Sequence, residues 1–260
     1  MSVKQHYDNF LAKYYSWMFG EFDLKVRENI DLFKKFKLTP RLSRRALDLG
    51  CGSGFQSIAL ADLGFTVLSI DLSSVLITEL RKRRGKRDIQ AVQDDIINFP
   101  RYLQGKPVEI IVCMGDTLTH LEAFDEVVDL FKKAYQSLEN NCRLILTFRD
   151  YRKELKGVNR FIPVQSNEDR ILTCFLEYEP DHINVYDIIH EKTEMGWKMT
   201  ASNYKKLRID VEWVKEKLQE LGFHSSFYEL RNGFITLVAV KQSRRRTADG
   251  SFSYFCFTGP

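Results

Sequence analysis

The chain lacks the sequence features that mark several large classes of protein. No two cysteines form a C-x-x-C pair, and no apolar run approaches the length of a membrane-spanning helix. The N-terminal residues 1–9 are polar and charged, and the apolar segment of a secretion signal does not follow them. The cysteines are odd in number and widely spaced: Cys51, Cys113, Cys142, Cys174 and Cys256. This pattern argues against a disulfide framework, a zinc site and membrane contact, so we expect a protein of the reducing cytoplasm.

The chain also lacks a strong charge of either sign. Its formal net charge is +4 over 260 residues, whereas the basic surface of a dedicated nucleic-acid-binding protein would dominate the composition. One basic run, Arg81 to Arg87, ends an expected helix, where positive charge complements the helix dipole. A patch that binds phosphate backbones is the alternative, but no aromatic residues interleave with the run to stack on bases. The composition favours one large domain, or a domain with an insertion, and disfavours nucleic acid as a partner.

A glycine-rich stretch lacks the residues of two common nucleotide motifs. Residues 46–55 read ALDLGCGSGF, which predicts an apolar strand, a tight turn and the start of a helix. A dinucleotide fingerprint would need a glycine where Ser57 stands, and the Gly-Lys-Ser/Thr ending of a P-loop is missing. Glycines at alternate positions still let the backbone approach a ligand closely. The next strand ends in Asp71, whose carboxylate suits the two hydroxyls of a ribose, so the pattern predicts a nucleotide-binding α/β sheet.

Strands and helices alternate along the first half of the chain. Strands are expected at 46–49, 67–71, 89–92, 108–114 and 144–148, with amphipathic helices between them and a helical segment over 5–36. This rhythm predicts a doubly wound parallel sheet. Beyond residue 150 three strands, 171–178, 183–190 and 197–206, follow one another without helices, which predicts an antiparallel insertion. A helix over 211–221 and a hairpin that turns at Asn232-Gly233 are expected to complete the fold.

Two motifs point to one family. The D-x-G-x-G-x-G pattern from Asp48 to Gly54, with Asp71 after it, resembles the first motif of the class I S-adenosyl-L-methionine (SAM)-dependent methyltransferases. The stretch from Cys113 to Leu121 resembles the Gly-Asn-Ser-x-x-His-Leu loop of small-molecule methyltransferases like glycine N-methyltransferase, with Asp116 in place of the Asn. The resemblance covers most of residues 10–240. It implies a Rossmann-like fold, SAM as cofactor and S-adenosyl-L-homocysteine as product.

The resemblance also implies a division of the chain. We expect N-terminal cap helices in residues 1–40, the SAM-binding core in 41–150 and an antiparallel β insertion capping the acceptor site in 151–210. Residues 211–241 would end the core fold, and 242–260 would form a C-terminal tail. That tail combines the basic run Arg244 to Arg246 with aromatic residues, and its role is left open.

The cofactor site that the resemblance implies lies at the strand ends. Asp71 would bind the ribose, Asp95 the adenine amino group and Ile96 the adenine ring, although adjacent aspartates equally suit a turn cap. A tyrosine of the Tyr14-Tyr15 run would approach the methionine end of the cofactor. The expected cofactor-binding residues are Tyr14, Asp48, Gly50, Cys51, Gly52, Gly54, Asp71, Leu72, Asp94, Asp95, Ile96, Met114 and Gly115.

Catalytic and acceptor-binding candidates come from the second motif and the insertion. His120 would act as a general base near neutral pH, or would anchor the next helix by hydrogen bonds. Asp116 would orient an amine or cap a turn, and Tyr15 is the third catalytic candidate. An acidic acceptor would need an arginine, because the guanidinium group matches a carboxylate. The expected acceptor-binding residues are Arg149, Arg170, Tyr178 and Tyr204.

These observations lead to one functional hypothesis with open alternatives. The chain is expected to move a methyl group from SAM to a small-molecule amine by in-line displacement, as a monomer or homodimer and without a metal. Methylation of oxygen or sulfur, an RNA or protein methyltransferase, and a SAM-binding regulator without turnover remain alternatives.

Overall fold

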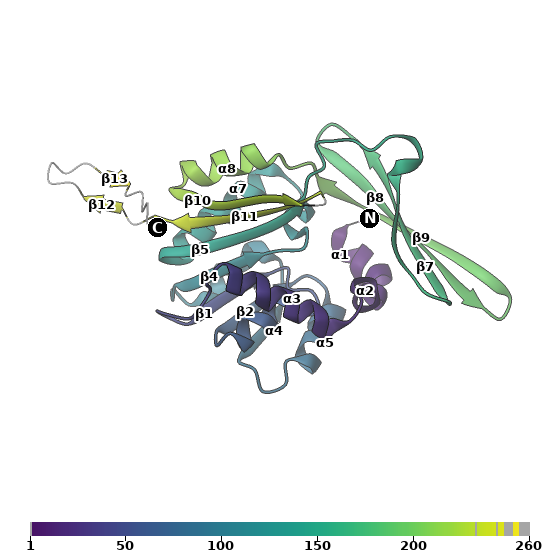
Figure 1. Ribbon diagram of the computed structural model, residues 1–260, viewed down its shortest axis with the longest axis horizontal. Coiled ribbons are helices and arrows are strands. Elements are labelled where there is room, and N and C mark those ends of the chain that lie inside the picture. Colours follow the sequence, from purple (N-terminus) through teal and green to yellow (C-terminus); the bar gives the residue numbers. More distant parts are fainter. Residues whose placement is uncertain (1, 232, 243, 247–251, 255–260) are drawn as a thin grey trace.

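A sheet of seven strands forms the centre of the computed structural model, which describes residues 2–231, 233–242, 244–246 and 252–254. The strand order is β10-β11-β5-β4-β1-β2-β3 (Figure 1). Neighbours among β1 to β5 are parallel, and β11 runs antiparallel to both β5 and β10. The strands are β1 (Arg45–Leu49), β2 (Thr66–Asp71), β3 (Ile89–Gln93), β4 (Val108–Cys113), β5 (Leu138–Arg149), β10 (Phe223–Arg231) and β11 (Phe234–Lys241). The predicted doubly wound, mostly parallel sheet is confirmed.

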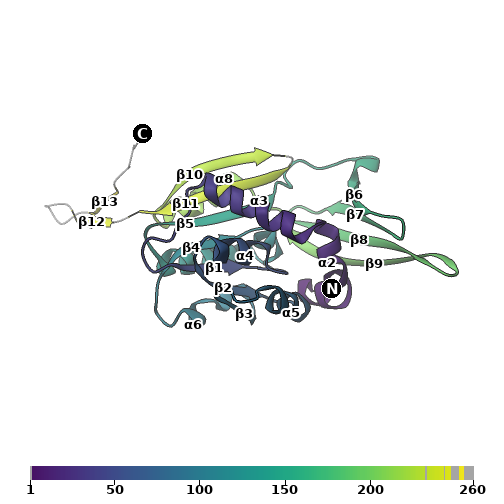
Figure 2. The ribbon, with the colours of Figure 1, turned by 60° about the horizontal axis from the view of Figure 1, so that its bottom comes forward.

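Helices cover both faces of this sheet, because both faces of its parallel strands are apolar. On one face lie α3 (Phe22–Lys35), α4 (Phe55–Asp62) and α5 (Ser74–Arg83); Figure 2 shows α3 crossing the sheet. On the other face lie α6 (Pro100–Leu103), α7 (Phe124–Ser137) and α8 (Val211–Glu220). Side chains alternate along each strand, so Ala46 packs in the first layer and Leu47 in the second.

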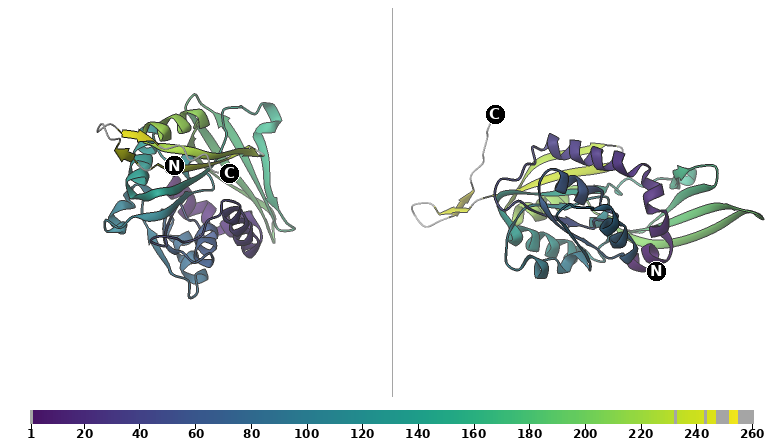
Figure 3. Two further views of the ribbon diagram at one scale, coloured as in Figure 1. Left: turned by 60° about the vertical axis from the view of Figure 1, so that its left-hand side comes forward. Right: turned by 90° about the horizontal axis from the view of Figure 1, so that it is seen from below.

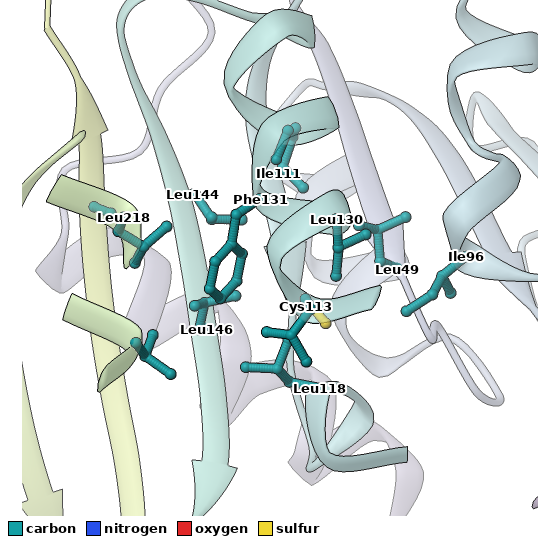
Figure 4. Close-up of a cluster of buried hydrophobic side chains, with 14 of the residues drawn as sticks. Leu49, Ile96, Ile111, Cys113, Leu118, Leu130, Phe131, Leu144, Leu146 and Leu218 are labelled. Atoms are coloured by element: carbon teal, nitrogen blue, oxygen red, sulfur yellow. The ribbon is translucent and has the colours of Figure 1, made fainter. Parts of the chain in front are cut away.

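The larger of the two core layers is centred on α7. Figure 4 shows Phe131 of this helix beside Leu144 and Leu146 of β5, with Leu218 of α8 beyond them, while Leu130 lies next to Leu49 of β1. All of these side chains are buried. They fix the sheet and its loops on one side of the ligand cavity described below.

The predicted antiparallel insertion is present after β5. It is a sheet of β6 (Phe161–Ser166), β7 (Arg170–Tyr178), β8 (His182–Thr193) and β9 (Gly196–Leu207), in that order. The β8–β9 hairpin extends away from the core (Figure 1, Figure 3). The strand β6 was not predicted, because Pro163 and a bulge between Pro163 and Gln165 interrupt the alternation that marks a strand.

The N-terminal segment is helical, as predicted, but not continuous. It consists of α1 (Val3–His6), a π-helix η1 (Tyr7–Leu11) and α2 (Ala12–Phe19), which lie between the core and the inserted sheet (Figure 1). Gly20, with φ +82°, separates α2 from α3. The prediction of one helical segment over 5–36 was therefore wrong at Gly20, where a positive φ that favours glycine ends the helix.

Shorter elements complete the described chain. They are the 3-10 turns η2 (Ile96–Asn98), η3 (Thr117–His120) and η4 (Gly157–Arg160), and the paired strands β12 (Arg244–Arg246) and β13 (Phe252–Tyr254). Asn232 of the predicted hairpin turn, and Phe255 and Phe257 of the tail, lie outside the described residues. Within the described part of the chain, no helix has the length and apolar character needed to cross a membrane.

Candidate active site

A cavity of about 400 Å³ opens at the carboxyl ends of the parallel strands. Ligands of open α/β sheets bind at this edge, and the N-terminal helices contribute part of the wall. The lining residues come from the N-terminal segment, the glycine loop and the loops after β2, β3 and β4. They are Ser2, Val3, Lys4, Tyr7, Tyr15, Gly50, Gly52, Asp71, Leu72, Ser73, Leu76, Asp95, Ile96, Gly115, Thr117, His120, Leu121, Glu122 and Glu126.

Two glycines of the loop after β1 keep the cavity open. Gly50 and Gly52 have φ of +72° and +52°, a backbone region that favours glycine. A Cβ atom on Gly50 would collide with the Thr117 side chain, and one on Gly52 would lie 2.7 Å from the Tyr15 hydroxyl. Gly54 has a different role, because its missing side chain makes room for Leu80 and it lies outside the cavity lining.

Asp71 lies at the tip of β2 and faces the cavity. Its Oδ2 accepts a hydrogen bond from Gly52 N at 2.8 Å, and its Oδ1 accepts one from Ser73 N at 2.9 Å. Burial raises the pKa of Asp71, although these two backbone bonds act in the opposite direction. Each oxygen retains a lone pair, so the carboxylate can accept hydrogen bonds from the hydroxyls of a ribose.

The two adjacent aspartates after β3 point to different places. Asp95 lines the cavity with Leu72 and Ile96, and its Oδ1 also accepts a hydrogen bond from Ile97 N at 2.9 Å. It therefore both caps η2 and faces the ligand space. Asp94 is absent from the lining, because its carboxylate is held by Asn98, Tyr102 and Arg101.

Asp48 lies behind the glycine loop rather than in the cavity. Its side chain is 1% exposed, and its Oδ2 accepts a hydrogen bond from Ser57 Oγ at 2.5 Å. Burial raises the pKa of Asp48 to about 7, against the effect of the Ser57 hydrogen bond. Ser57 stands where a dinucleotide fingerprint has glycine. Its hydrogen bond to Asp48 thus supports the glycine loop on the side away from the cavity. Cys51 and Met114 are likewise buried and outside the lining.

The tyrosine pair of α2 is divided between two environments. Tyr15 lines the cavity above Gly52. Tyr14 is 1% exposed and donates a hydrogen bond to Glu191 Oε2 of β8 at 2.6 Å, so it anchors the helix to the inserted sheet. A second tyrosine, Tyr7, also lines the cavity. The sequence did not indicate this, because the wide turn of the π-helix η1 that contains Tyr7 leaves no sequence signal.

His120 reaches the cavity from the end of η3. Its Nε2 is buried and has no hydrogen-bond partner among the described residues. Burial and the nearby charge of Lys206 lower the pKa of His120 to about 3, against the opposing effect of Asp116. The imidazole is therefore neutral at neutral pH, which suits a hydrogen-bonding group better than the general base that the sequence suggested.

Asp116 does not line the cavity, although Gly115 and Thr117 on either side of it do. It is 4% exposed, and its carboxylate binds Lys206 Nζ of β9 at 2.6 Å. Burial alone raises the pKa of Asp116, but the charge and hydrogen bond of Lys206 outweigh this and lower it to about 2. In the structure Asp116 therefore supports its loop through the bond to Lys206, and a direct role in catalysis stays a prediction.

None of the four expected acceptor-binding residues lines the cavity. The guanidinium of Arg149 lies over Phe234, and that of Arg170 pairs with Glu191 at 3.3 Å. Tyr178 packs beneath Arg208, and Tyr204 is buried in a stack on His6. Arg170, Tyr178 and Tyr204 belong to the inserted sheet, and the N-terminal helices lie between that sheet and the core (Figure 1).

Carboxylates dominate the charged groups of the cavity wall. Asp71, Asp95, Glu122 and Glu126 line it, and the one cation of the described lining, Lys4, pairs with Asp8 at 2.5 Å. Glu122 and Glu126 begin the segment after the second motif, and no pattern in the sequence pointed to them. Among the described residues, no group of three or more His, Cys, Asp or Glu side chains is placed to hold a metal ion.

The cofactor implied by the resemblance fits this wall. The open backbone of Gly50 and Gly52, together with the Asp71 carboxylate, suits a ribose, while Leu72 and Ile96 supply apolar surface for an adenine beside Asp95. The backbone and the carboxylate are already fixed by hydrogen bonds, so the site is preformed.

Comparisons with known proteins agree with this fit. A family model described as "Methyltransferase domain" matches residues 46–141. "Putative methyltransferase YqeM" of Bacillus subtilis is 31% identical over 69% of this chain and 73% of its own length. A "Glycine/sarcosine N-methyltransferase" of Halorhodospira halochloris is 28% identical over 57% of this chain and 55% of its own length. The chain spans about half the length of the glycine/sarcosine N-methyltransferases that it matches.

Solved structures share the fold. SAM-bound CalS10, an amino pentose methyltransferase from Micromonospora echinaspora, superimposes with a TM-score of 0.70 at 17% identity, covering 84% of this chain and 91% of CalS10. One family assignment follows from the sheet order, from the glycine loop with Asp71 and from the extent of the YqeM match. The chain belongs to the class I SAM-dependent methyltransferases.

Proposed function

We propose that this protein transfers the methyl group of SAM to the nitrogen of a small-molecule amine. The observation that carries the proposal is that Gly52, Asp71 and His120 line the same cavity, and that His120 Nε2 has no hydrogen-bond partner among the described residues. A cavity of about 400 Å³ favours a small acceptor. The names of the relatives, glycine/sarcosine and amino pentose methyltransferases, support an amine.

The roles of the cofactor-facing residues follow from their chemistry. SAM, when bound, supplies a methyl group already activated on a cationic sulfur. Asp71 accepts hydrogen bonds from the ribose, Asp95 accepts one from the adenine amino group, and Ile96 packs on the ring. Tyr15 covers the glycine loop and excludes water from it. The protein therefore acts by alignment and exclusion of water rather than by activating the methyl group.

His120 orients the acceptor in this proposal. Its neutral imidazole places Nε2 where it can accept a hydrogen bond from an N–H group of the acceptor, which directs the nitrogen lone pair. Since the pKa of His120 is about 3, its imidazole is too weak a base to hold a proton at neutral pH. The acceptor amine must therefore lose its proton to solvent before the transfer.

The negative charge of the cavity wall restricts the class of acceptor further. An amino acid would bring a carboxylate next to Glu122 and Glu126, with Lys4 already paired to Asp8. An amine without an acid group, such as an amino sugar or a polyamine, meets no such repulsion. We therefore propose an uncharged or cationic amine, and we set aside the sequence-based hypothesis of an acidic acceptor bound by arginines.

Nucleic acid is a weaker candidate partner. In the basic run, Arg81 and Arg84 donate hydrogen bonds to the carbonyl groups of Ala91 and Ile89, and Arg87 pairs with Asp62 at 2.5 Å. These bonds hold the guanidinium groups against the chain around β3, and Asp62 offsets the charge of Arg87, so fewer of their N–H groups remain for a phosphate backbone. A cytoplasmic location and a monomeric or homodimeric state stay predictions.

The test uses methyl-labelled SAM with the purified protein and four acceptors: glucosamine, spermidine, glycine and sarcosine. We expect label on glucosamine or spermidine and little on the two amino acids. Label on glycine or sarcosine would contradict the acceptor class while supporting amine methylation. Two results would overturn the proposal. In one, SAM binds but no label reaches these acceptors or a small-molecule extract. In the other, label reaches only RNA or protein.

A further inference from the structure

Lys206 brings a buried positive charge from the inserted sheet to the loop after β4. Its side chain is 8% exposed, and its Nζ contacts Asp116 Oδ2 at 2.6 Å and the Tyr151 hydroxyl at 3.4 Å. Among the described residues, Asp116 is the one carboxylate that pairs with it. A buried ammonium group without a counter-charge is costly, so the position of Lys206 depends on Asp116.

Asp116 in turn needs its partners, because its backbone is strained. It has φ +80° and ψ +1°, a left-handed conformation that non-glycine residues rarely adopt. Its Oδ1 accepts a hydrogen bond from Arg149 N at 2.8 Å, and its Oδ2 accepts one from the Tyr151 hydroxyl at 3.1 Å. The carboxylate is therefore held both from the end of β5 and from β9.

The residues next to Asp116 are the ones that face the ligand. Gly115 and Thr117 line the cavity on either side, and His120 lines it one turn later. Thr119 also donates both its N–H and its hydroxyl to the Asp116 carbonyl, at 3.0 and 2.7 Å. A shift of Asp116 would thus displace both the wall of the cofactor site and His120.

We propose that Lys206 is a positioning residue for methyl transfer, which acts through Asp116 to set the conformation of the Gly115–His120 loop. The inference rests on the proposed function of the cavity. It explains why this chain has an aspartate where the resemblance has an asparagine: the carboxylate matches a lysine that the inserted sheet supplies. The insertion therefore contributes to the site without touching the ligand.

The charge pair also acts on His120 directly. Burial, Lys206 and His6 lower the pKa of His120, and Asp116 raises it. Among the described residues, the aromatic rings in contact with His120 are those of Tyr7 and Tyr204, with ring centroids at 5.8 and 5.6 Å. Without Lys206, the cation that pairs with Asp116 among the described residues is Arg149, whose Nε lies 3.7 Å from Oδ2. The loss of the closer positive charge should make His120 easier to protonate. This provides a readout that a purely structural role would not move.

The experiment compares Lys206→Met, Asp116→Asn and the double variant, with Lys205→Met as control. Lys205 is the exposed neighbour of Lys206 and pairs with Glu179 at the surface. The readouts are the NMR titration of the His120 ring, assigned with His120→Asn, the dissociation constant of SAM and the melting temperature. None of them requires an acceptor, so a failure of the proposed methyl transfer leaves this test intact.

For Lys206→Met we expect the pKa of His120 to rise by roughly one unit or more and SAM to bind about tenfold more weakly. In the double variant no buried charge is left unpaired, and the asparagine amide can still bind Arg149 N and the Tyr151 hydroxyl. We expect it to fold even where a single variant does not, with SAM affinity restored to within about threefold. Lys205→Met should behave as wild type.

Two results would overturn the proposal. One is a folded Lys206→Met protein with unchanged His120 titration and unchanged SAM affinity. The other is a double variant whose losses are the sum of those of the single variants, because that would mean that the two residues act independently.

Discussion

Tyr14 and Tyr15 are adjacent in the chain and face different sides of α2. The Tyr14 hydroxyl donates to Glu191 Oε2 at 2.6 Å, whereas Tyr15 lies over Gly52 at the cavity wall. Successive residues of a helix point about 100° apart, so one of the pair can anchor the helix to the inserted sheet while the other contacts the ligand space.

Removing each hydroxyl should therefore have a different effect. Tyr14→Phe leaves Glu191 without this donor and should lower the free energy of unfolding by about 1 kcal/mol, with little change in SAM affinity. Tyr15→Phe should weaken SAM binding several-fold while the melting temperature changes little. Calorimetric titration and thermal melting of both variants check this pair, and an exchange of the two effects would contradict the assignment.

Asp71 should be the main determinant of cofactor affinity. Asp71→Ala removes the carboxylate proposed to bind the ribose and should weaken SAM binding by about 100-fold, since charge-assisted hydrogen bonds contribute roughly 1.5–3 kcal/mol each. Asp71→Asn retains one acceptor oxygen and should lose less. Circular dichroism controls for folding, because Asp71 also binds two backbone N–H groups. Unchanged SAM affinity in folded Asp71→Ala would refute the role.

Gly52→Ala should block the site. A Cβ atom there combines the strain of φ +52° with a 2.7 Å contact to the Tyr15 hydroxyl. Gly157→Ala is the matched control, because Gly157 has φ +55° but no atom within 4 Å of its Cβ position. Both variants should lose about 1 kcal/mol of stability from backbone strain, but Gly52→Ala alone should also weaken SAM binding at least tenfold. If Gly52→Ala and Gly157→Ala bound SAM equally well, the close approach of Tyr15 to Gly52 would be contradicted.

Asp48 should make stability depend on pH. Its folded-state pKa of about 7 lies above the ordinary value of 3.8, so the native state binds the proton more tightly than the unfolded state. The stability that this proton contributes is complete below pH 4 and is lost as the pH rises through 7, by at most about 4 kcal/mol. Asp48→Asn should remove this loss and gain stability relative to wild type between pH 5 and pH 8, as urea denaturation would measure. If the stability of Asp48→Asn differed from that of wild type by the same amount at pH 5 and at pH 8, a raised pKa of Asp48 would be ruled out.

His120 should leave no inflection in the activity profile near pH 6.5. Since its pKa is lowered to about 3, it stays neutral across the usual assay range. Transfer to an amine should instead rise with pH and level off at the pKa of the acceptor itself. His120→Asn should lower kcat without changing the shape of this profile. An inflection near pH 6.5 that disappears in the variant would restore His120 as a general base.

The local patterns of the sequence determined the fold and one half of the site. Alternating apolar strands and amphipathic helices predicted the parallel sheet, and the change of rhythm after residue 150 predicted the inserted strands. The glycine loop and Asp71 were found in the same way, since a tight turn between a strand and a helix needs residues of fixed type at fixed spacing. These features depend on neighbours within a few residues, so one sequence is enough to reveal them.

Tertiary structure decided which candidate side chains reach the ligand. Arg149, Arg170, Tyr178 and Tyr204 were plausible by residue type, but none of them lines the cavity. Tyr7 reaches the cavity through a π-helical turn, and Asp116 leaves it for Lys206, a partner 90 residues away. The positive charge of Lys206 in turn helps to keep His120 neutral. The sequence determines the types of residue available, whereas burial and long-range charge pairing, which arise only when distant segments pack together, determine their protonation and access to the ligand.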